Sequence, residues 1–139
     1  MIPLRLVIDT NVVVSAALKP EGLQRTILIL ALTRPCRLYV SQQILAEYRN
    51  VLSRPELHIR RGLRQQLLHL ISARSHTVRL GRRLDVASDP DDNMFIECAD
   101  AARADYLVTE NLKHFPAFWK NTKVISPREF IGLVAPHIV

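Results

Sequence analysis

The most constraining feature of this chain is a short apolar run near its N-terminus. Leu4 to Ile8 is continuously apolar except for Arg5, and it ends at Asp9. A run of this kind, without regular alternation of polar residues, predicts a strand buried on both faces, as in the centre of a parallel sheet. Thr10 and Asn11 are expected to begin the loop at its carboxyl end.

Further strands and helices alternate along the rest of the chain. The predicted strands span residues 4–8, 37–40, 76–80, 104–109 and 122–125, and the predicted helices cover 23–32, 42–53, 63–71, a segment from 92, and a short segment after Ser126. Ser126 begins a capping sequence that ends at Glu129, which predicts the start of the last helix. This order predicts a single α/β domain over residues 1–139, with an open, mostly parallel sheet of about five strands covered on both faces.

Carboxylates lie near the ends of several of these elements. Asp9 ends the first strand, Glu47 borders the apolar stripe of the helix over 42–53, and Asp92 begins a later helix. Because ligands bind at the carboxyl ends of parallel strands, one pocket is expected to collect these acids with the turn from Thr109 to Asn111. Like charges this close repel unless a divalent cation or protons neutralise them. Oxygen ligands suit Mg²⁺ or Mn²⁺, which predicts metal-assisted hydrolysis of a phosphodiester.

For five other acidic residues between positions 89 and 105, the sequence predicts a role in the site less clearly. Asp89 and Asp91 are expected to be additional ligands, loop caps or solvated side chains. Asp105 is expected at the start of its strand, away from the pocket. Glu97 and Asp100 are expected on the outer surface of their helix, opposite its apolar stripe.

Basic residues are concentrated in the middle of the chain, which carries a net charge of +6 overall. Nine arginines but only one acid, Glu56, lie between residues 49 and 83. A basic surface beside an acidic pocket suits an enzyme that acts on a phosphate backbone, and the candidate nucleic-acid contacts are Arg49, Arg54, Arg82 and Arg83. The alternative is a pair of solvated basic helices with no role in binding. The five histidines are expected on the surface or in this basic region.

Several other chemistries lack the residues they need. The sequence has no G-x-G-x-x-G or G-x-x-x-x-G-K-[ST] phosphate loop, no H-E-x-x-H and no G-x-S-x-G. Cys36 and Cys98 form no C-x-x-C pair and are expected to be buried apolar residues. No apolar run approaches the roughly 18 residues of a membrane helix. With no secretory signal pattern at the N-terminus, a cytoplasmic protein is expected.

Taken in order, these motifs resemble a known family. Val7 to Val12 contains Asp9-Thr10-Asn11, Glu47 follows 38 residues after Asp9, and Asp89 to Asn93 precedes the strand over 104–109. Together they resemble the PIN domain, and within it the VapC-like toxin components of toxin–antitoxin systems. The resemblance implies a three-layer α/β/α sandwich and Mg²⁺- or Mn²⁺-dependent cleavage of single-stranded RNA.

The same resemblance implies roles for individual residues. Asp9, Glu47 and Asp92 match the acidic residues that hold the metal, and Asn11 and Thr109 match polar residues that support the site. It also implies a protein antitoxin as partner and a homodimer or higher homo-oligomer.

The chain departs from the family pattern at the fourth acidic position. Relatives often have T-x-D where this chain has Thr109-Glu110-Asn111. Asn111 offers a carbonyl oxygen to a ligand or a water without adding negative charge, so it remains a catalytic candidate. Either Glu110 or Asp105 substitutes for the acid, or a second metal binds weakly. A non-catalytic RNA-binding or regulatory PIN domain therefore stays open as an alternative. A nuclease directed at DNA also stays open, because a basic surface does not distinguish RNA from DNA without a group that reads the 2′-hydroxyl.

Overall fold

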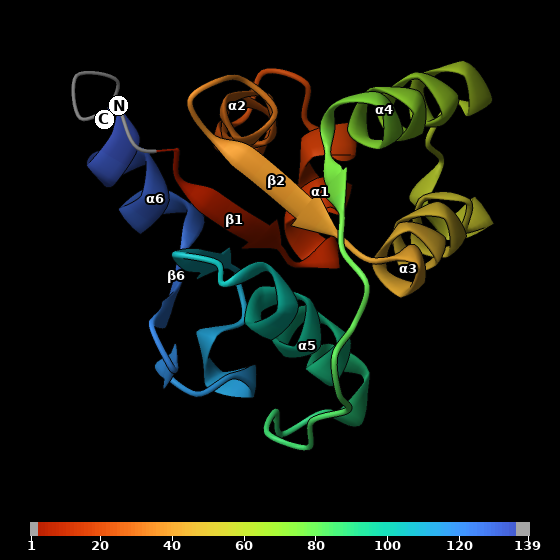
Figure 1. Cartoon of the computed structure of the whole chain (residues 1–139). Coiled ribbons are helices and arrows are strands. Elements are labelled where there is room, and N and C mark those ends of the chain that lie inside the picture. Colours follow the sequence, from red (N-terminus) through yellow and green to blue (C-terminus); the bar gives the residue numbers. More distant parts are fainter. Residues whose placement is uncertain (1–2, 136–139) are drawn as a thin grey trace.

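The computed structural model describes residues 3–135, and these residues form a six-stranded sheet (Figure 1). The strands are β1 (Arg5–Ile8), β2 (Arg37–Val40), β3 (His76–Thr77), β4 (Tyr106–Val108), β5 (Phe118–Trp119) and β6 (Thr122–Ile125). Their order is β3-β2-β1-β4-β6-β5, and every neighbouring pair is parallel except β5 with β6. The predicted mostly parallel sheet is confirmed.

Helices cover both faces of this sheet. They are α1 (Thr10–Leu18), α2 (Leu23–Ala31), α3 (Gln42–Leu52), α4 (Arg61–Arg74), α5 (Asn93–Ala102) and α6 (Pro127–Val134). Helices α1 and α2 pack together and α6 packs on α2, whereas α5 packs against β1, β2 and β4 (Figure 1). The arrangement is the expected three-layer α/β/α sandwich. No helix within residues 3–135 is long and apolar enough to cross a membrane.

The chain changes direction across the sheet at β1. It runs outward from β1 to β2 and β3, and then returns through α5 to β4 on the other side of β1. Right-handed crossovers in opposite directions place their helices on opposite faces, which leaves a crevice at the carboxyl ends of β1 and β4. Asp9 N donates to Val108 O at 3.0 Å, so the two strand ends are held side by side.

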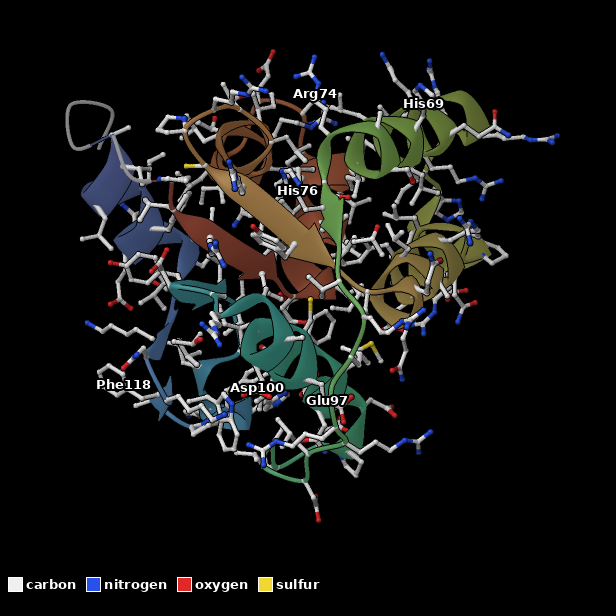
Figure 2. The ribbon with its side chains drawn as sticks, in the orientation of Figure 1. His69, Arg74, His76, Glu97, Asp100 and Phe118 are labelled. Atoms are coloured by element: carbon white, nitrogen blue, oxygen red, sulfur yellow. The ribbon has the colours of Figure 1, made fainter. Side chains whose placement is uncertain are left out.

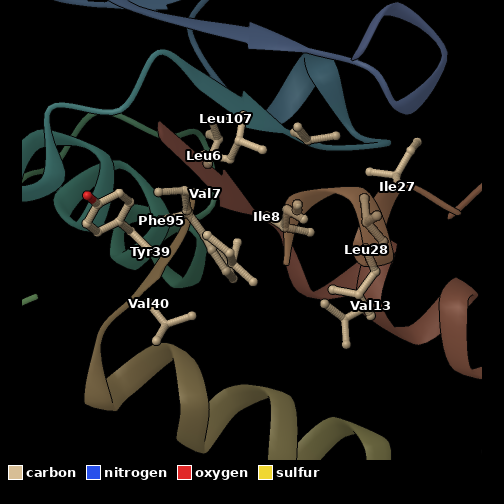
Figure 3. Close-up of a cluster of buried hydrophobic side chains, with 14 of the residues drawn as sticks. Leu6, Val7, Ile8, Val13, Ile27, Leu28, Tyr39, Val40, Phe95 and Leu107 are labelled. Atoms are coloured by element: carbon tan, nitrogen blue, oxygen red, sulfur yellow. The ribbon is translucent and has the colours of Figure 1, made fainter. Parts of the chain in front are cut away.

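The central strand is buried on both faces, as its sequence predicts. Leu6, Val7 and Ile8 are fully buried. Figure 3 shows them between side chains of α2, such as Leu28, and Phe95 of α5. Fully burying an aliphatic side chain contributes roughly 1.5–3 kcal/mol, so this strand anchors the fold and gives its carboxyl end a fixed position.

Capping residues set the helix boundaries that the sequence predicts best. Ser126 Oγ accepts from Glu129 N at 3.1 Å, while Ser126 N donates to Glu129 Oε1 at 3.2 Å, which is the predicted capping box. Ser41 Oγ accepts from Ile44 N at 3.1 Å and starts α3 at Gln42. The residue numbers of β2 and β6 also match their predictions.

Two local predictions are wrong. Thr10 and Asn11 do not begin a loop, because α1 starts at Thr10 directly after the strand. The backbone of Asp9 serves as the N-cap, but its carboxylate makes no capping bond, and the valines that follow have low helix propensity, so the usual start signals are weak. The turn predicted through Phe118 instead contains β5, an edge strand of two residues.

Candidate functional site

A pocket of about 510 Å³ lies at the carboxyl ends of β1 and β4. Thr10 and Glu56 are among the residues that line it, and Asp91 and Asp105 are not. The predicted site residues that line it are Asp9, Glu47, Asp92, Asn111, Asn11 and Glu110, joined by Asp89, Arg54 and His114.

Asp9 and Asn111 are connected through the hydroxyl of Thr109. Thr109 Oγ1 donates to Asp9 Oδ2 at 2.7 Å and accepts from Asn111 N at 3.0 Å. Thr109 is fully buried and Asp9 is 5% exposed. Burial raises the pKa of Asp9 from its ordinary 3.8 to about 6, with the charges of Asp92 and Glu47 adding to the rise and the Thr109 bond opposing it.

Replacing Thr109 by valine keeps the shape of the side chain but removes both hydrogen bonds. Asn111 N–H then loses its acceptor and Asp9 loses its donor in a buried environment. We expect Thr109→Val to lower the free energy of unfolding by about 1–3 kcal/mol. Thr109→Ser keeps the hydroxyl and serves as the control in urea unfolding. A free energy of unfolding for Thr109→Val equal to that of the unaltered protein would show that these bonds contribute nothing.

Glu47 reaches the pocket because α3 is fastened to the end of β1. The next residue, Tyr48, is fully buried, and its hydroxyl donates to the carbonyl oxygen of Ile8, which precedes Asp9. Thr10 Oγ1 contacts Glu47 Oε2 at 3.5 Å. The buried contact between Tyr48 and Ile8, the residues next to Glu47 and Asp9 in the sequence, therefore helps to bring the two carboxylates to the same pocket.

Asp92 enters the pocket from a 3₁₀ turn, Pro90–Asp92. Asp89 Oδ1 accepts from Asp91 N at 3.0 Å and caps this turn. Burial, with the charge of Asp89 as the next cause, raises the pKa of Asp92. Its Oδ2 lies 3.3 Å from His114 Nδ1, within ion-pair distance, although the two atoms do not meet hydrogen-bond geometry.

Two buried oxygens in this pocket lack a hydrogen-bond partner. Within residues 3–135, Asn11 Oδ1 and Asp92 Oδ2 are two of only four such side-chain atoms. Buried polar atoms are normally paired, so two orphaned oxygens in one acidic pocket fit a cation with oxygen ligands. No three described His, Cys, Asp or Glu side chains lie close enough to hold an ion by themselves. Mg²⁺ does not require three such side chains, because it commonly binds one or two carboxylates and keeps several waters.

The sequence matches a PIN domain family model over residues 5–113. The chain belongs to the PIN domain family. It is 30% identical over 141 residues to an uncharacterized protein of Methanocaldococcus jannaschii, with 94% of this chain and 91% of the relative covered. Its fold is similar to the crystal structure of VapBC2 from Rickettsia felis bound to a DNA fragment from their promoter. That match has a TM-score of 0.58 and 17% identity, and it covers 88% of this chain and 98% of the other.

The four predicted nucleic-acid arginines lie in different places on this PIN domain. Arg54 lines the acidic pocket. Arg49 lines a separate hollow of about 330 Å³ with Arg64. On α3 it lies about 200° around the helix axis from Glu47. Arg82 contacts Asp100 at 3.7 Å, with its guanidinium carbon 6.0 Å from the centre of the Trp119 ring, and Arg83 is exposed. Only Arg54 is positioned beside the candidate site.

The surface positions predicted for Glu97 and Asp100 are wrong. Glu97 is 8% exposed, and its Oε2 accepts from Leu84 N at 2.8 Å. Asp100 accepts from Trp119 Nε1 at 3.1 Å and pairs with Lys120 at 2.8 Å, and these contacts lower its pKa. Both residues lie on α5 beside the coil that precedes the pocket (Figure 2). Both side chains connect α5 to other segments of the fold. Their partners lie outside α5, so the helical pattern of α5 does not predict these contacts.

The remaining predicted residues have clear positions. Asp105 Oδ2 accepts from Arg5 N at 2.8 Å, outside the pocket, as expected. Glu110 is held on the α1 and α2 side of the pocket, where its carboxylate accepts from Gln24 Nε2 at 2.5 Å and contacts Ser15 Oγ at 3.5 Å. Cys98 is buried as predicted, but Cys36 is only partly buried. His114 is exposed, as predicted, and it lines the acidic pocket.

Proposed function

We propose that this PIN domain is a Mg²⁺- or Mn²⁺-dependent endoribonuclease that hydrolyses single-stranded RNA. The observation that carries the proposal is the shared pocket of Asp9, Glu47, Asp92 and Asn111, which also contains buried oxygens without partners. Burial raises the pKa of Asp9, with the charges of Asp92 and Glu47 adding to the rise, and a carboxylate perturbed in this way is typical of a site for a divalent cation.

The residues have distinct roles in this proposal. Asp9, Glu47 and Asp92 would hold the cation between them, directly or through its bound waters, and the bound cation would lower the pKa of a water and stabilise charge on the scissile phosphate. Thr109 fixes the Asp9 carboxylate through its 2.7 Å bond, and the Asn111 side chain orients water or substrate. Arg54, which lines the pocket, binds a neighbouring phosphate. Asp9 is only 5% exposed, so a flexible single strand reaches it more easily than a duplex.

We further propose that the protein is the toxin of a toxin–antitoxin pair and acts in the cytoplasm. The fold neighbour from Rickettsia felis is VapBC2, which supports a protein antitoxin as partner. Large exposed apolar side chains, including Phe118 at 58% and Leu133 at 56%, supply surface for this partner or for a second copy of the chain.

The direct test is cleavage of a labelled single-stranded RNA by the purified protein with Mn²⁺. We expect Asp9→Ala to reduce the rate by about 100-fold or more, because it removes a charge that stabilises the reacting phosphate. Equal cleavage by both proteins would refute the proposal. A matched DNA oligonucleotide in the same assay distinguishes a ribonuclease from a nuclease directed at DNA.

A second candidate is a non-catalytic RNA-binding or regulatory PIN domain. Asn111 at the expected fourth acidic position, and carboxylates too far apart to hold an ion by themselves within residues 3–135, favour it. Calorimetric titration with Mn²⁺ separates the two candidates. Binding no stronger than that of an Asp9→Ala, Asp92→Ala double variant would support the non-catalytic one.

A further inference from the structure

His114 lines the pocket but has no role in the mechanism above. Its Nδ1 lies 3.3 Å from Asp92 Oδ2. Among the ion pairs of residues 3–135, this is the only one that involves a carboxylate of the pocket, since the other two join Asp100 to Arg82 and Lys120. Besides burial, the charges of Asp89 and Asp91 raise the pKa of Asp92, and the neighbouring His114 opposes that rise.

Hydrogen bonds to the backbone of His114 hold the turn that carries this residue at the pocket. His114 N donates to Asn111 O at 2.9 Å, which closes the 3₁₀ turn Leu112–His114. The carbonyl oxygen of His114 accepts from both Ser88 N at 3.1 Å and Ser88 Oγ at 3.2 Å. Ser88 directly precedes Asp89, the cap of the turn that carries Asp92. These bonds join the two segments that bring Asn111 and Asp92 to the pocket.

We propose that His114 is a positioning residue for cation binding, whose Nδ1 holds the Asp92 carboxylate in the orientation that a divalent cation requires. The inference rests on the proposed function, because it assigns that carboxylate to a cation. Groups that hold a metal-binding side chain from behind typically change metal affinity by about 10–100-fold when they are removed. A neutral imidazole with its hydrogen on Nδ1 also donates to a carboxylate, so the role does not require a charged ring.

The opposite role is competition, in which His114 occupies Asp92 and must be displaced by the cation. Two observations favour positioning. His114 approaches Asp92 Oδ2, and none of the hydrogen bonds described within residues 3–135 involves Asp92 Oδ1, so a cation can bind Oδ1 while the 3.3 Å contact stays in place. The Ser88 bonds hold the turn at the pocket wall, whereas a displaceable group would be expected on a segment without such bonds.

The test compares Mn²⁺ affinity by calorimetry for the full chain and four variants. His114→Ala removes the contact. His114→Asn places an amide nitrogen at the same distance along the side chain as Nδ1, while His114→Gln places it one bond farther out, like Nε2. His69→Ala is the matched control, since His69 is an exposed histidine on α4 that does not line the pocket (Figure 2). Thermal unfolding checks that each variant is folded.

We expect His114→Ala to weaken Mn²⁺ binding by about 10-fold or more, with His114→Asn recovering most of the loss and His114→Gln little of it. His69→Ala should bind like the unaltered protein. Unchanged or tighter binding by His114→Ala would overturn the inference, and so would equal recovery by Asn and Gln. If His114→Ala does not fold, the comparison of Asn with Gln decides. Absence of Mn²⁺ binding by the unaltered protein would instead overturn the proposed function.

Discussion

Asp9→Asn is expected to make the metal-free protein more stable while abolishing RNA cleavage. Asp9 is buried beside Asp92 and Glu47, and its pKa is raised from 3.8 to about 6, so its ionised form destabilises the folded state. A pKa change of this size corresponds to at most about 3 kcal/mol at pH 7.5. Asparagine removes the charge, and its carbonyl oxygen still accepts the hydrogen bond from Thr109. We expect the melting temperature in EDTA to rise by roughly 5 °C or more.

The pH dependence has a definite sign. Because the pKa of Asp9 is higher in the folded state than its ordinary 3.8, the folded protein holds a proton that the unfolded chain has lost between about pH 4 and pH 6. The contribution of Asp9 to stability therefore falls as the pH rises through this window and stays low above it. The stability difference between Asp9→Asn and the unaltered protein should be near zero at pH 4 and largest above pH 7.

Asp105→Asn is the matched control, since Asp105 is an exposed aspartate outside the pocket. We expect it to change stability by less than about 0.5 kcal/mol. Adding Mn²⁺ should raise the melting temperature of the unaltered protein, because a ligand that binds the folded state stabilises it, but not that of Asp9→Asn. A lower melting temperature for Asp9→Asn than for the unaltered protein in EDTA would contradict this prediction. It would show that the ionised carboxylate of Asp9 stabilises the metal-free folded state.

The parts of the fold that sequence predicts well are those encoded by neighbouring residues. Three features were predicted from residues within their own segments. They are the apolar run before Asp9, the strand over 37–40 and the Ser126 capping box. Helix α1 was missed because the carboxylate of Asp9 bonds Thr109, 100 residues away, instead of capping the helix. Strand β5 has only two residues and forms by pairing with β6, so no local pattern identifies it.

The same distinction applies to the site. Topology predicts that Asp9 and Glu47 meet at the strand ends but constrains the position of Asp92 less. All three line one pocket. Glu97 bonds Leu84 and His114 bonds Ser88, and neither partner could be predicted. Leu84 and Ser88 lie in a coil, and no sequence pattern predicts the position of that coil relative to the sheet. The four arginines were predicted to contact nucleic acid because basic residues are dense in that part of the sequence. Charge density does not distinguish the face of α3 that lies toward the pocket from the opposite face.

Asn93→Ala is expected to destabilise the protein and loosen the segment that leads to Asp92. Asn93 is 8% exposed, and its Oδ1 accepts from Val86 N at 2.9 Å and Ala87 N at 2.8 Å. Alanine leaves both amides without an acceptor, and each unsatisfied buried group costs about 1–3 kcal/mol. We expect a loss of about 2–5 kcal/mol in urea unfolding. Amide hydrogen exchange at Val86 and Ala87 should become faster.

Asn121→Ala is the control for this change. Asn121 is exposed, and it takes part in no hydrogen bond within residues 3–135. It should alter stability by less than about 0.5 kcal/mol. Since the coil ends at Asp89 and its 3₁₀ turn, loosening it should also weaken Mn²⁺ binding in Asn93→Ala. Slow exchange at Val86 and Ala87 in that variant would mean that Ser88 and Glu97 hold the coil without Asn93. In that case the pocket depends on the His114 turn and on Glu97 of α5 more than on Asn93.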